Sequence, residues 1–159
     1  MLRPAHLLRS ETIAAHITEN PVTLAVLLCI AWILPGLVGH DPWKPDEAYT
    51  FGIVYQLLKD GDWVVPMLAG EPYLAKPPLF YLSAALTGTL LAPMLPLHDG
   101  ARVAAGLYMA VAFLFIALSA KELYGSSKGW VAALMLLGCA GLLLQGHQLI
   151  AETALLAGL

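Results

Sequence analysis

Residues 103–120 read VAAGLYMAVAFLFIALSA, a run of eighteen residues without a charged side chain. A mostly apolar stretch of about 18 residues is long enough to cross the hydrocarbon core of a bilayer as a helix. Three further apolar runs accompany it, at residues 22–38, 79–97 and 129–144. The sequence therefore predicts an all-α integral membrane protein with three to five crossings.

The composition of the whole chain agrees with a membrane protein. Of its 159 residues, 59% are hydrophobic and 12% are charged, whereas a typical soluble domain has about 25% charged residues. The net charge of −3 provides no basic field that would attract nucleic acid. The composition thus excludes a water-soluble globule and a nucleic-acid-binding protein.

The cysteines and histidines do not form a pattern typical of metal binding. Cys29 and Cys139 lie far apart inside apolar runs, and the five histidines are scattered along the chain. Zinc and redox sites need such residues at short, characteristic spacings. The sequence therefore predicts neither a metal site nor a redox pair, and we expect no cofactor.

The order of polar and apolar segments divides the chain into four parts. Residues 1–21 are polar and carry two arginines, which favour a cytoplasmic start, and residues 22–39 form the first predicted transmembrane helix. Residues 40–78 then form a loop on the outer side, and residues 79–159 hold further transmembrane helices. The chain stops within an apolar stretch, so we expect it to be incomplete.

The outer loop is the most polar part of the chain, with six of the eleven acidic residues. Between Asp46, which follows a proline, and Gly61, apolar residues recur at helical spacing. They are Phe51, Val54, Tyr55 and Leu58. We expect an amphipathic helix lying on the membrane surface, with Trp43 and Trp63 at headgroup depth. A second, weaker element is predicted around residues 66–74.

Two adjacent acids, Asp46 and Glu47, open the predicted amphipathic helix. Acids at this position can cap a helix and interact with its positive end. A carboxylate beside a membrane is also partly desolvated, which raises its proton affinity and suits it to general-base catalysis on a hydroxyl acceptor. On the residues alone, both interpretations stay open.

Three other charged residues lie at the ends of the apolar runs or within them. Lys76, just before Pro77 and Pro78, either extends its charge to the interface or binds a lipid phosphate through its ammonium group. Arg102 fits an interfacial helix anchor. Glu152 lies inside an apolar stretch, and an acid at membrane depth is a functional candidate by default.

Four short motifs follow one another along the outer loop. They are Asp46-Glu47-Ala48-Tyr49, Gly61-Asp62-Trp63, Gly70-Glu71-Pro72-Tyr73 and Lys76-Pro77-Pro78. In this order and spacing they resemble the first outer loop of the bacterial lipid A aminoarabinose transferases and related glycosyltransferases, which are kin to the protein O-mannosyltransferases. The resemblance runs from about Trp43 to the end of the chain.

The resemblance implies a multi-pass fold of the GT-C type in the bacterial inner membrane, with the active-site loop facing the periplasm. It implies an enzyme that moves a sugar from a polyprenyl-phosphate donor to a lipid, protein or glycan acceptor, as in lipid A modification or protein glycosylation. Asp46 matches the catalytic acid, with Glu47 beside it in the catalytic pair, and Lys76, Glu152 and Arg102 match substrate-binding positions. The family enzymes are much longer, so this N-terminal portion alone is expected to be inactive.

The number of crossings decides whether Asp46 and Glu152 can face one site. If all three apolar runs after Lys76 crossed the bilayer, Glu152 would lie on the side opposite Asp46. One run must therefore stop part-way if both acids serve one site. The run 129–144 is the expected one, because about 16 helical residues reach only about 24 Å against a core of about 30 Å.

Two other functional classes stay open on the sequence. The chain fits part of a multi-helix transporter with Glu152 as an ion or proton relay, although the inverted repeats common in transporters are not visible. It also fits a non-catalytic scaffold whose outer loop docks a partner. For the enzyme, the expected partners are the sugar donor, a lipid or protein acceptor and membrane lipids.

Overall fold

The computed structural model describes residues 20–43 and 45–159. Nearly all of the predicted cytoplasmic segment, residues 1–21, lies outside the described residues. The elements are α2 (Pro21–Ile33), α3 (Asp46–Asp60), β1 (Met67–Leu68), β2 (Glu71–Pro72), α4 (Leu79–Leu91), α5 (Leu97–Tyr124), α6 (Gly129–Leu137), α7 (Ala140–Gln145) and α8 (Glu152–Gly158). The described chain is mostly helical, as predicted, and the weaker element predicted around residues 66–74 is a short antiparallel hairpin.

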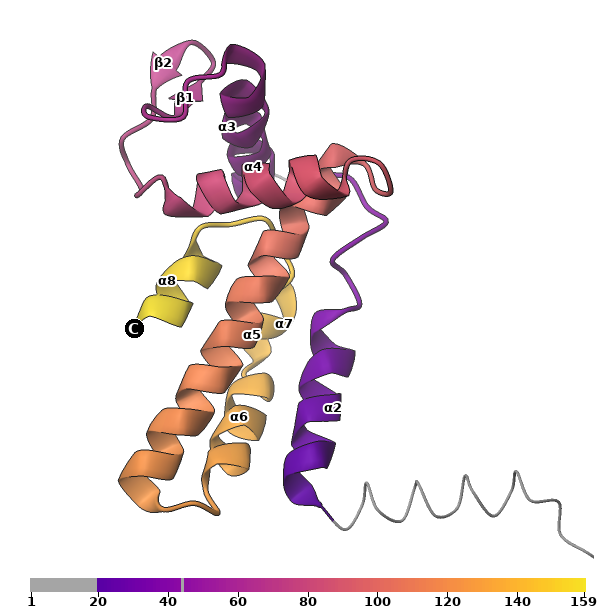
Figure 1. The fold of residues 1–159 in the computed structure, drawn as a ribbon, viewed down its shortest axis with the longest axis vertical. Coiled ribbons are helices and arrows are strands. Elements are labelled where there is room, and N and C mark those ends of the chain that lie inside the picture. Colours follow the sequence, from indigo (N-terminus) through magenta and orange to yellow (C-terminus); the bar gives the residue numbers. More distant parts are fainter. Residues whose placement is uncertain (1–19, 44) are drawn as a thin grey trace, which may run out of the picture.

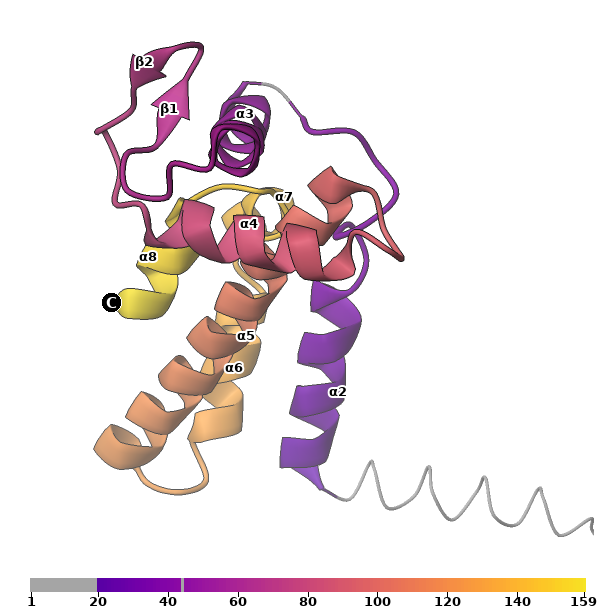
Figure 2. The same ribbon diagram turned by 45° about the horizontal axis from the view of Figure 1, so that its top comes forward.

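The helices form a bundle with a cap across one end (Figure 1). Helices α2, α5 and α6 run along the long axis of the structure, while α4 lies across the upper end of α5. Figure 2 shows α3 and the hairpin on the far side of α4 from the long helices. The loop between α2 and α4 therefore folds over α4. We call its α3 helix and its hairpin, residues 46–72, the cap.

Helix α5 is the only helix among the described residues that is long and apolar enough to cross a membrane. Its 28 residues rise about 42 Å, against a hydrocarbon core of about 30 Å. Helices α2 and α4 are apolar but have 13 residues each. The predicted first crossing, residues 22–39, is thus a shorter helix followed by turns.

Large apolar side chains remain exposed on α2 and α5. They include Val22, Val26, Ile30, Leu107, Leu114, Phe115 and Leu118. Contiguous apolar surface of this kind needs lipid or further helices to cover it. These exposed apolar side chains are compatible with the predicted membrane environment.

The predicted run 79–97 is divided into α4 and the start of α5. Pro93 and Pro96 lie between the two helices, and proline cannot continue a helix because it lacks the backbone N–H. The two helices then approach closely where they cross, since a Cβ added at Gly100 would lie 3.1 Å from the Cα of Gly88. Glycine at both positions allows α4 to lie across α5.

The chain returns along α5 through α6 and α7. Gly129 permits the close approach of α6, because a Cβ there would lie 2.7 Å from the carbonyl oxygen of Ala117. The run 129–144 is broken near Cys139 into two helices, and the chain then reaches α8, which lies below α4 at the capped end (Figure 1). Helix α4 lies across the bundle (Figure 1). The expectation that the run 129–144 stops part-way through the membrane stays a prediction.

Helix α3 has the predicted ends and, except at Tyr55, the predicted apolar face. It begins at Asp46 and ends before Gly61, whose φ of 71° closes it in the left-handed conformation. The buried residues are Glu47, Thr50, Ile53, Val54 and Leu57. The predicted face included Tyr55, which is 51% exposed. Val54 is buried as predicted, and Phe51 and Leu58 pack against the core around Phe80 and Tyr81 that α4 supplies, so the predicted face is confirmed except at Tyr55.

Candidate functional site

Two of the loop motifs act as turns that fold the cap back onto α4. After Gly61, the Asp62 carboxylate accepts hydrogen bonds from the backbone N–H groups of Val64 at 2.9 Å and Val65 at 3.3 Å. An aspartate that accepts such bonds from the residues just after it defines a tight turn. This turn reverses the chain after α3 and directs it into the hairpin.

The second turn joins β1 to β2. Ala69 and Gly70 have φ values of 53° and 88°, as a two-residue hairpin turn requires. The backbone N–H of Tyr73 then donates to the carbonyl oxygen of Pro66 at 2.8 Å. The Tyr73 ring packs edge-on against the ring of Tyr81 on α4, with 6.1 Å between the ring centroids. The hairpin is thereby held against α4, and the chain reaches Lys76 just before that helix.

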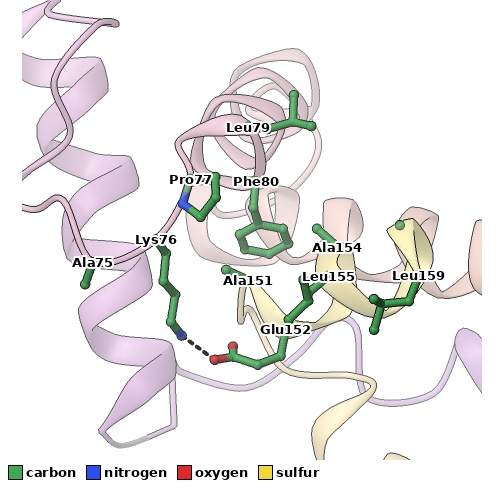
Figure 3. Close-up of a pocket in the computed structure, with 11 residues that line it drawn as sticks. Ala75, Lys76, Pro77, Leu79, Phe80, Ala151, Glu152, Ala154, Leu155 and Leu159 are labelled. Atoms are coloured by element: carbon green, nitrogen blue, oxygen red, sulfur yellow. Dashed lines mark hydrogen bonds and ion pairs between the residues drawn. The ribbon is translucent and has the colours of Figure 1, made fainter.

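Lys76 and Glu152 form an ion pair across 76 positions of sequence (Figure 3). Lys76 comes from the segment before α4, and Glu152 is the first residue of α8. Their side chains are 35% and 51% exposed, respectively. The fold therefore brings two of the predicted site residues into direct contact at a surface that a ligand can reach.

The ion pair lies on the wall of a cavity of about 430 Å³. Figure 3 shows the Lys76 ammonium pointing toward the Glu152 carboxylate, with apolar side chains around them. Apart from the charged pair, the lining is formed by Ala75, Pro77, Leu79, Phe80, Ala151, Ala154, Leu155, Gly158 and Leu159. The cavity thus combines one charged spot with an apolar wall.

The ion pair sets the charge of Glu152. Burial raises the pKa of this carboxyl, but the hydrogen bond and the positive charge of Lys76, with a backbone hydrogen bond, lower it by more. The net pKa of Glu152 lies below its ordinary value, so the carboxylate is ionised at neutral pH. Burial, with smaller effects of Tyr73 and Glu152, raises the pKa of Tyr81 well above its usual range, so that phenol stays protonated.

Glu47 and Arg102 meet in a second cluster, which is buried. The Arg102 guanidinium donates from Nε to Glu47 Oε1 at 2.7 Å and from Nη1 to Asp99 Oδ1 at 2.7 Å. Arg102 and Glu47 are 0% and 1% exposed. Neither is among the described residues that line the cavity.

Asp99 is a member of this cluster that the sequence reasoning missed. It lies three residues before Arg102, one turn earlier on the same face of α5, and that spacing is the signal that pairs an acid with an arginine. Its second oxygen accepts the backbone N–H of Gly39 at 3.0 Å. Asp99 therefore connects α5 to the segment after α2.

The Asp46 side chain belongs to neither cluster. It is exposed at the first turn of α3, and the described residues that line the cavity do not include it. The five predicted site residues thus fall into one exposed pair, one buried pair and one surface acid. Their predicted roles in catalysis and substrate binding stay predictions.

The fold and the site define a class of protein, a helical protein with one helix long and apolar enough to cross a membrane and a charged pair beside an apolar cavity. No family model and no solved structure matches the chain. Curated relatives do match it, and they carry the name undecaprenyl phosphate-alpha-4-amino-4-deoxy-L-arabinose arabinosyl transferase. The resemblance seen in the loop motifs is confirmed, because the chain is homologous to these glycosyltransferases over part of their length.

The relatives differ in how much of the chain they match. The transferase of Edwardsiella ictaluri is 44% identical over 55 residues, which are 35% of this chain and 10% of the relative. That of Serratia proteamaculans is 39% identical over 56 residues, again 35% and 10%. Transferase 1 of Pseudomonas fluorescens is 28% identical over 140 residues, 80% of this chain and 24% of the relative. The chain therefore spans a quarter or less of the length of these relatives.

Proposed function

We propose that this chain forms part of a glycosyltransferase that takes a sugar from a polyprenyl-phosphate donor. The names of its relatives support the reaction class, because they describe transfer of an aminoarabinose unit from undecaprenyl phosphate. The observation that carries the proposal is the ion pair of Lys76 and Glu152 on the wall of an apolar cavity. This arrangement matches a ligand with one anionic group and a long hydrocarbon chain.

The two parts of such a donor fit the two kinds of surface in the cavity. An ammonium group is a compact charge with three hydrogen-bond donors, so Lys76 can hold Glu152 and a phosphate oxygen together. The apolar wall around Phe80 and Leu155 offers a surface for the first isoprene units. The phosphate therefore binds at Lys76, with the prenyl chain along the wall.

The chemistry then follows from the charges. The bond between the anomeric carbon and the phosphate oxygen breaks, and its electron pair stays on the leaving polyprenyl phosphate. Lys76 stabilises that growing negative charge, while Glu152 orients the ammonium group. An acceptor oxygen forms the new bond to the anomeric carbon.

Asp46 is exposed at the start of α3 and is not among the described residues that line the cavity, so in this scheme it serves the acceptor and not the donor. If the acceptor is a hydroxyl group, its proton passes to the exposed Asp46 carboxylate as the new bond forms. If the acceptor is a phosphate, as on lipid A, there is no proton to remove and Asp46 positions the acceptor.

We place the cap of α3 and the hairpin on the periplasmic side of the inner membrane, in a multi-pass fold to which α5 contributes one crossing.

The decisive experiment compares two lysine variants in the full-length protein that carries this chain. Lys76→Ala removes the phosphate contact, and Lys59→Ala removes an exposed lysine in the last turn of α3. We expect Lys76→Ala to lower transfer from radiolabelled polyprenyl-phosphate sugar by about 10²-fold or more and to weaken donor binding, with Lys59→Ala unchanged.

Equal transfer by Lys76→Ala and wild type would contradict the proposal. Proton-coupled uptake of a solute that is lost in Glu152→Gln, without any transfer of sugar, would favour the transporter instead. Lys76→Ala, Lys59→Ala and Glu152→Gln are each compared with wild type at equal amounts of protein in the membrane, so that a change in insertion is not mistaken for a change in activity.

A further inference from the structure

The Glu47 carboxylate is in contact with three separate segments of the chain. Its Oε1 atom accepts hydrogen bonds from Arg102 Nε at 2.7 Å and from the backbone N–H of Leu149 at 2.8 Å. Its Oε2 atom accepts the backbone N–H of Trp43 at 2.6 Å. One buried side chain thus joins the segment before α3, the start of α5 and the turn before α8.

The contact with Leu149 is the one that reaches the candidate site. Leu149 is fully buried in the core shared by α3 and α4. It lies in the turn between α7 and α8, three residues before Glu152. A displacement of the Leu149 backbone over so few residues changes where the Glu152 carboxylate lies relative to Lys76.

Arg102 gives the cluster a fixed geometry. Besides its two carboxylate partners, it donates from Nη1 to the carbonyl of Leu37 and from Nη2 to that of His40, each at 3.2 Å. The planar guanidinium thereby uses four of its five donor hydrogens in a single orientation. Glu47 is held at the Nε edge of the guanidinium and cannot move away without breaking a buried ion pair.

We infer that Glu47 is a positioning residue, which ties the start of α3 to the turn before α8 and so sets Glu152 against Lys76. Its effect on transfer rests on the proposed function, whereas its hold on Leu149 does not. Arg102 keeps a second carboxylate, Asp99, when Glu47 is removed. A Glu47→Ala variant therefore leaves the buried arginine paired, and we expect it to fold.

The first test measures hydrogen exchange of the Leu149 amide in the full-length protein in detergent. A hydrogen bond to a charged acceptor is stronger than an ordinary one, so Glu47→Ala should speed exchange at Leu149 about tenfold. Exchange within the middle of α5, residues 108–118, serves as the internal control and should not change. Unchanged exchange at Leu149 would overturn the inference.

Glu47→Gln covers the case in which Glu47→Ala does not fold. The amide keeps the size of the side chain and one acceptor oxygen, but its NH₂ group faces donors that the carboxylate satisfied. We expect faster exchange at Leu149 or at Trp43 in this variant. Exchange at wild-type rates at both amides would again overturn the inference.

The second test asks whether Glu47 acts through Glu152. If it does, Glu47→Ala as a single change lowers the transfer rate. In the double variant, adding Glu47→Ala to Glu152→Ala then lowers the rate by less than a further threefold. If Glu47 only stabilises the fold, the loss of transfer in the double variant equals the product of the losses in the two single variants. Multiplied losses would therefore reject the positioning role.

The two proposals can fail separately. If Lys76→Ala transfers sugar normally, the proposed function fails, while faster exchange at Leu149 in Glu47→Ala still supports the link between the cap and the turn. If the exchange does not change but Lys76→Ala is inactive, the proposed function stands and the link is absent.

Discussion

The two charged clusters near the cap differ in how completely their charges are satisfied. In the exposed pair, Lys76 and Glu152 share one contact and line a cavity. In the buried cluster, Glu47, Asp99 and Arg102 are enclosed, and their charged atoms also bind backbone groups of other segments. A charge with unused bonding capacity beside a cavity can accept a ligand, whereas a buried charge with its partners in place holds the fold together.

The largest effect should come from removing the centre of the buried cluster. Arg102→Ala leaves Glu47 and Asp99 buried without their cation, and breaking a buried ion pair in this way costs about 3–5 kcal/mol. We expect the full-length protein to lose most of its folded population, measured as a drop in Tm in detergent. Lys121→Ala, which removes an exposed charge from the same helix, should leave the Tm unchanged.

If Arg102→Ala and Lys121→Ala lowered the Tm equally, the conclusion that the buried cluster holds the fold together would be contradicted. Arg102→Lys refines the test, because lysine keeps the charge but lacks the planar set of five donors. We expect it to recover only part of the lost stability.

A smaller effect should follow from separating α4 from α5. A methyl group at Gly100 would lie 3.1 Å from the Cα of Gly88 and 3.3 Å from its carbonyl oxygen, and neither backbone atom can move away easily. Overpacking of this kind costs about 1–3 kcal/mol. We expect Gly100→Ala to lower the free energy of unfolding by that amount, measured by denaturant titration in micelles.

Gly141→Ala is the matched control for Gly100→Ala. It adds the same methyl group to α7 at a position where nothing lies within 4 Å. If Gly100→Ala is as stable as this control, the close crossing of α4 over α5 is wrong. The crossing also brings Lys76 to the end of the bundle at which Glu152 lies, so its loss would separate the exposed pair.

Local features of the fold were predictable from the sequence, but contacts between distant segments were not. Pro45 before Asp46 and Gly61 marked the ends of α3 because proline and glycine act on the backbone nearby. The buried face of α3 depended on α4, which joins it only after the hairpin. Pro93 and Pro96 were the available signal that the run 79–97 is broken. The run was interpreted as one crossing because it is long enough to span a bilayer.

The candidate site was predictable to the same degree. The loop motifs and the apolar surroundings marked Lys76 and Glu152 as functional candidates, but their contact depends on the direction of α4, which no local pattern specifies. Glu47 and Arg102 were also selected as charged residues. The sequence did not show that they bind each other, because an ion pair 55 positions apart has no spacing rule.

The smallest effect concerns the pH dependence of the exposed pair. Burial raises the pKa of Glu152, but Lys76 and a backbone hydrogen bond lower it below the ordinary value of 4.5. A lowered pKa means that the ion pair stabilises the folded state fully above pH 4.5 and less as the pH falls through the folded-state pKa. Because both side chains are partly exposed, solvent limits the contribution to less than about 1 kcal/mol.

Glu152→Gln isolates this contribution, because glutamine keeps the shape of the side chain without a titrating group. We expect the Tm of wild type to exceed that of Glu152→Gln by a small, constant margin between pH 5 and pH 7 and the margin to shrink in more acidic solution. Glu122→Gln, at an exposed position on α5, should show no such trend. A margin that stays constant through acid pH would mean that Lys76 does not pair with Glu152, and the exposed cluster would then lose the feature that sets it apart from the buried one.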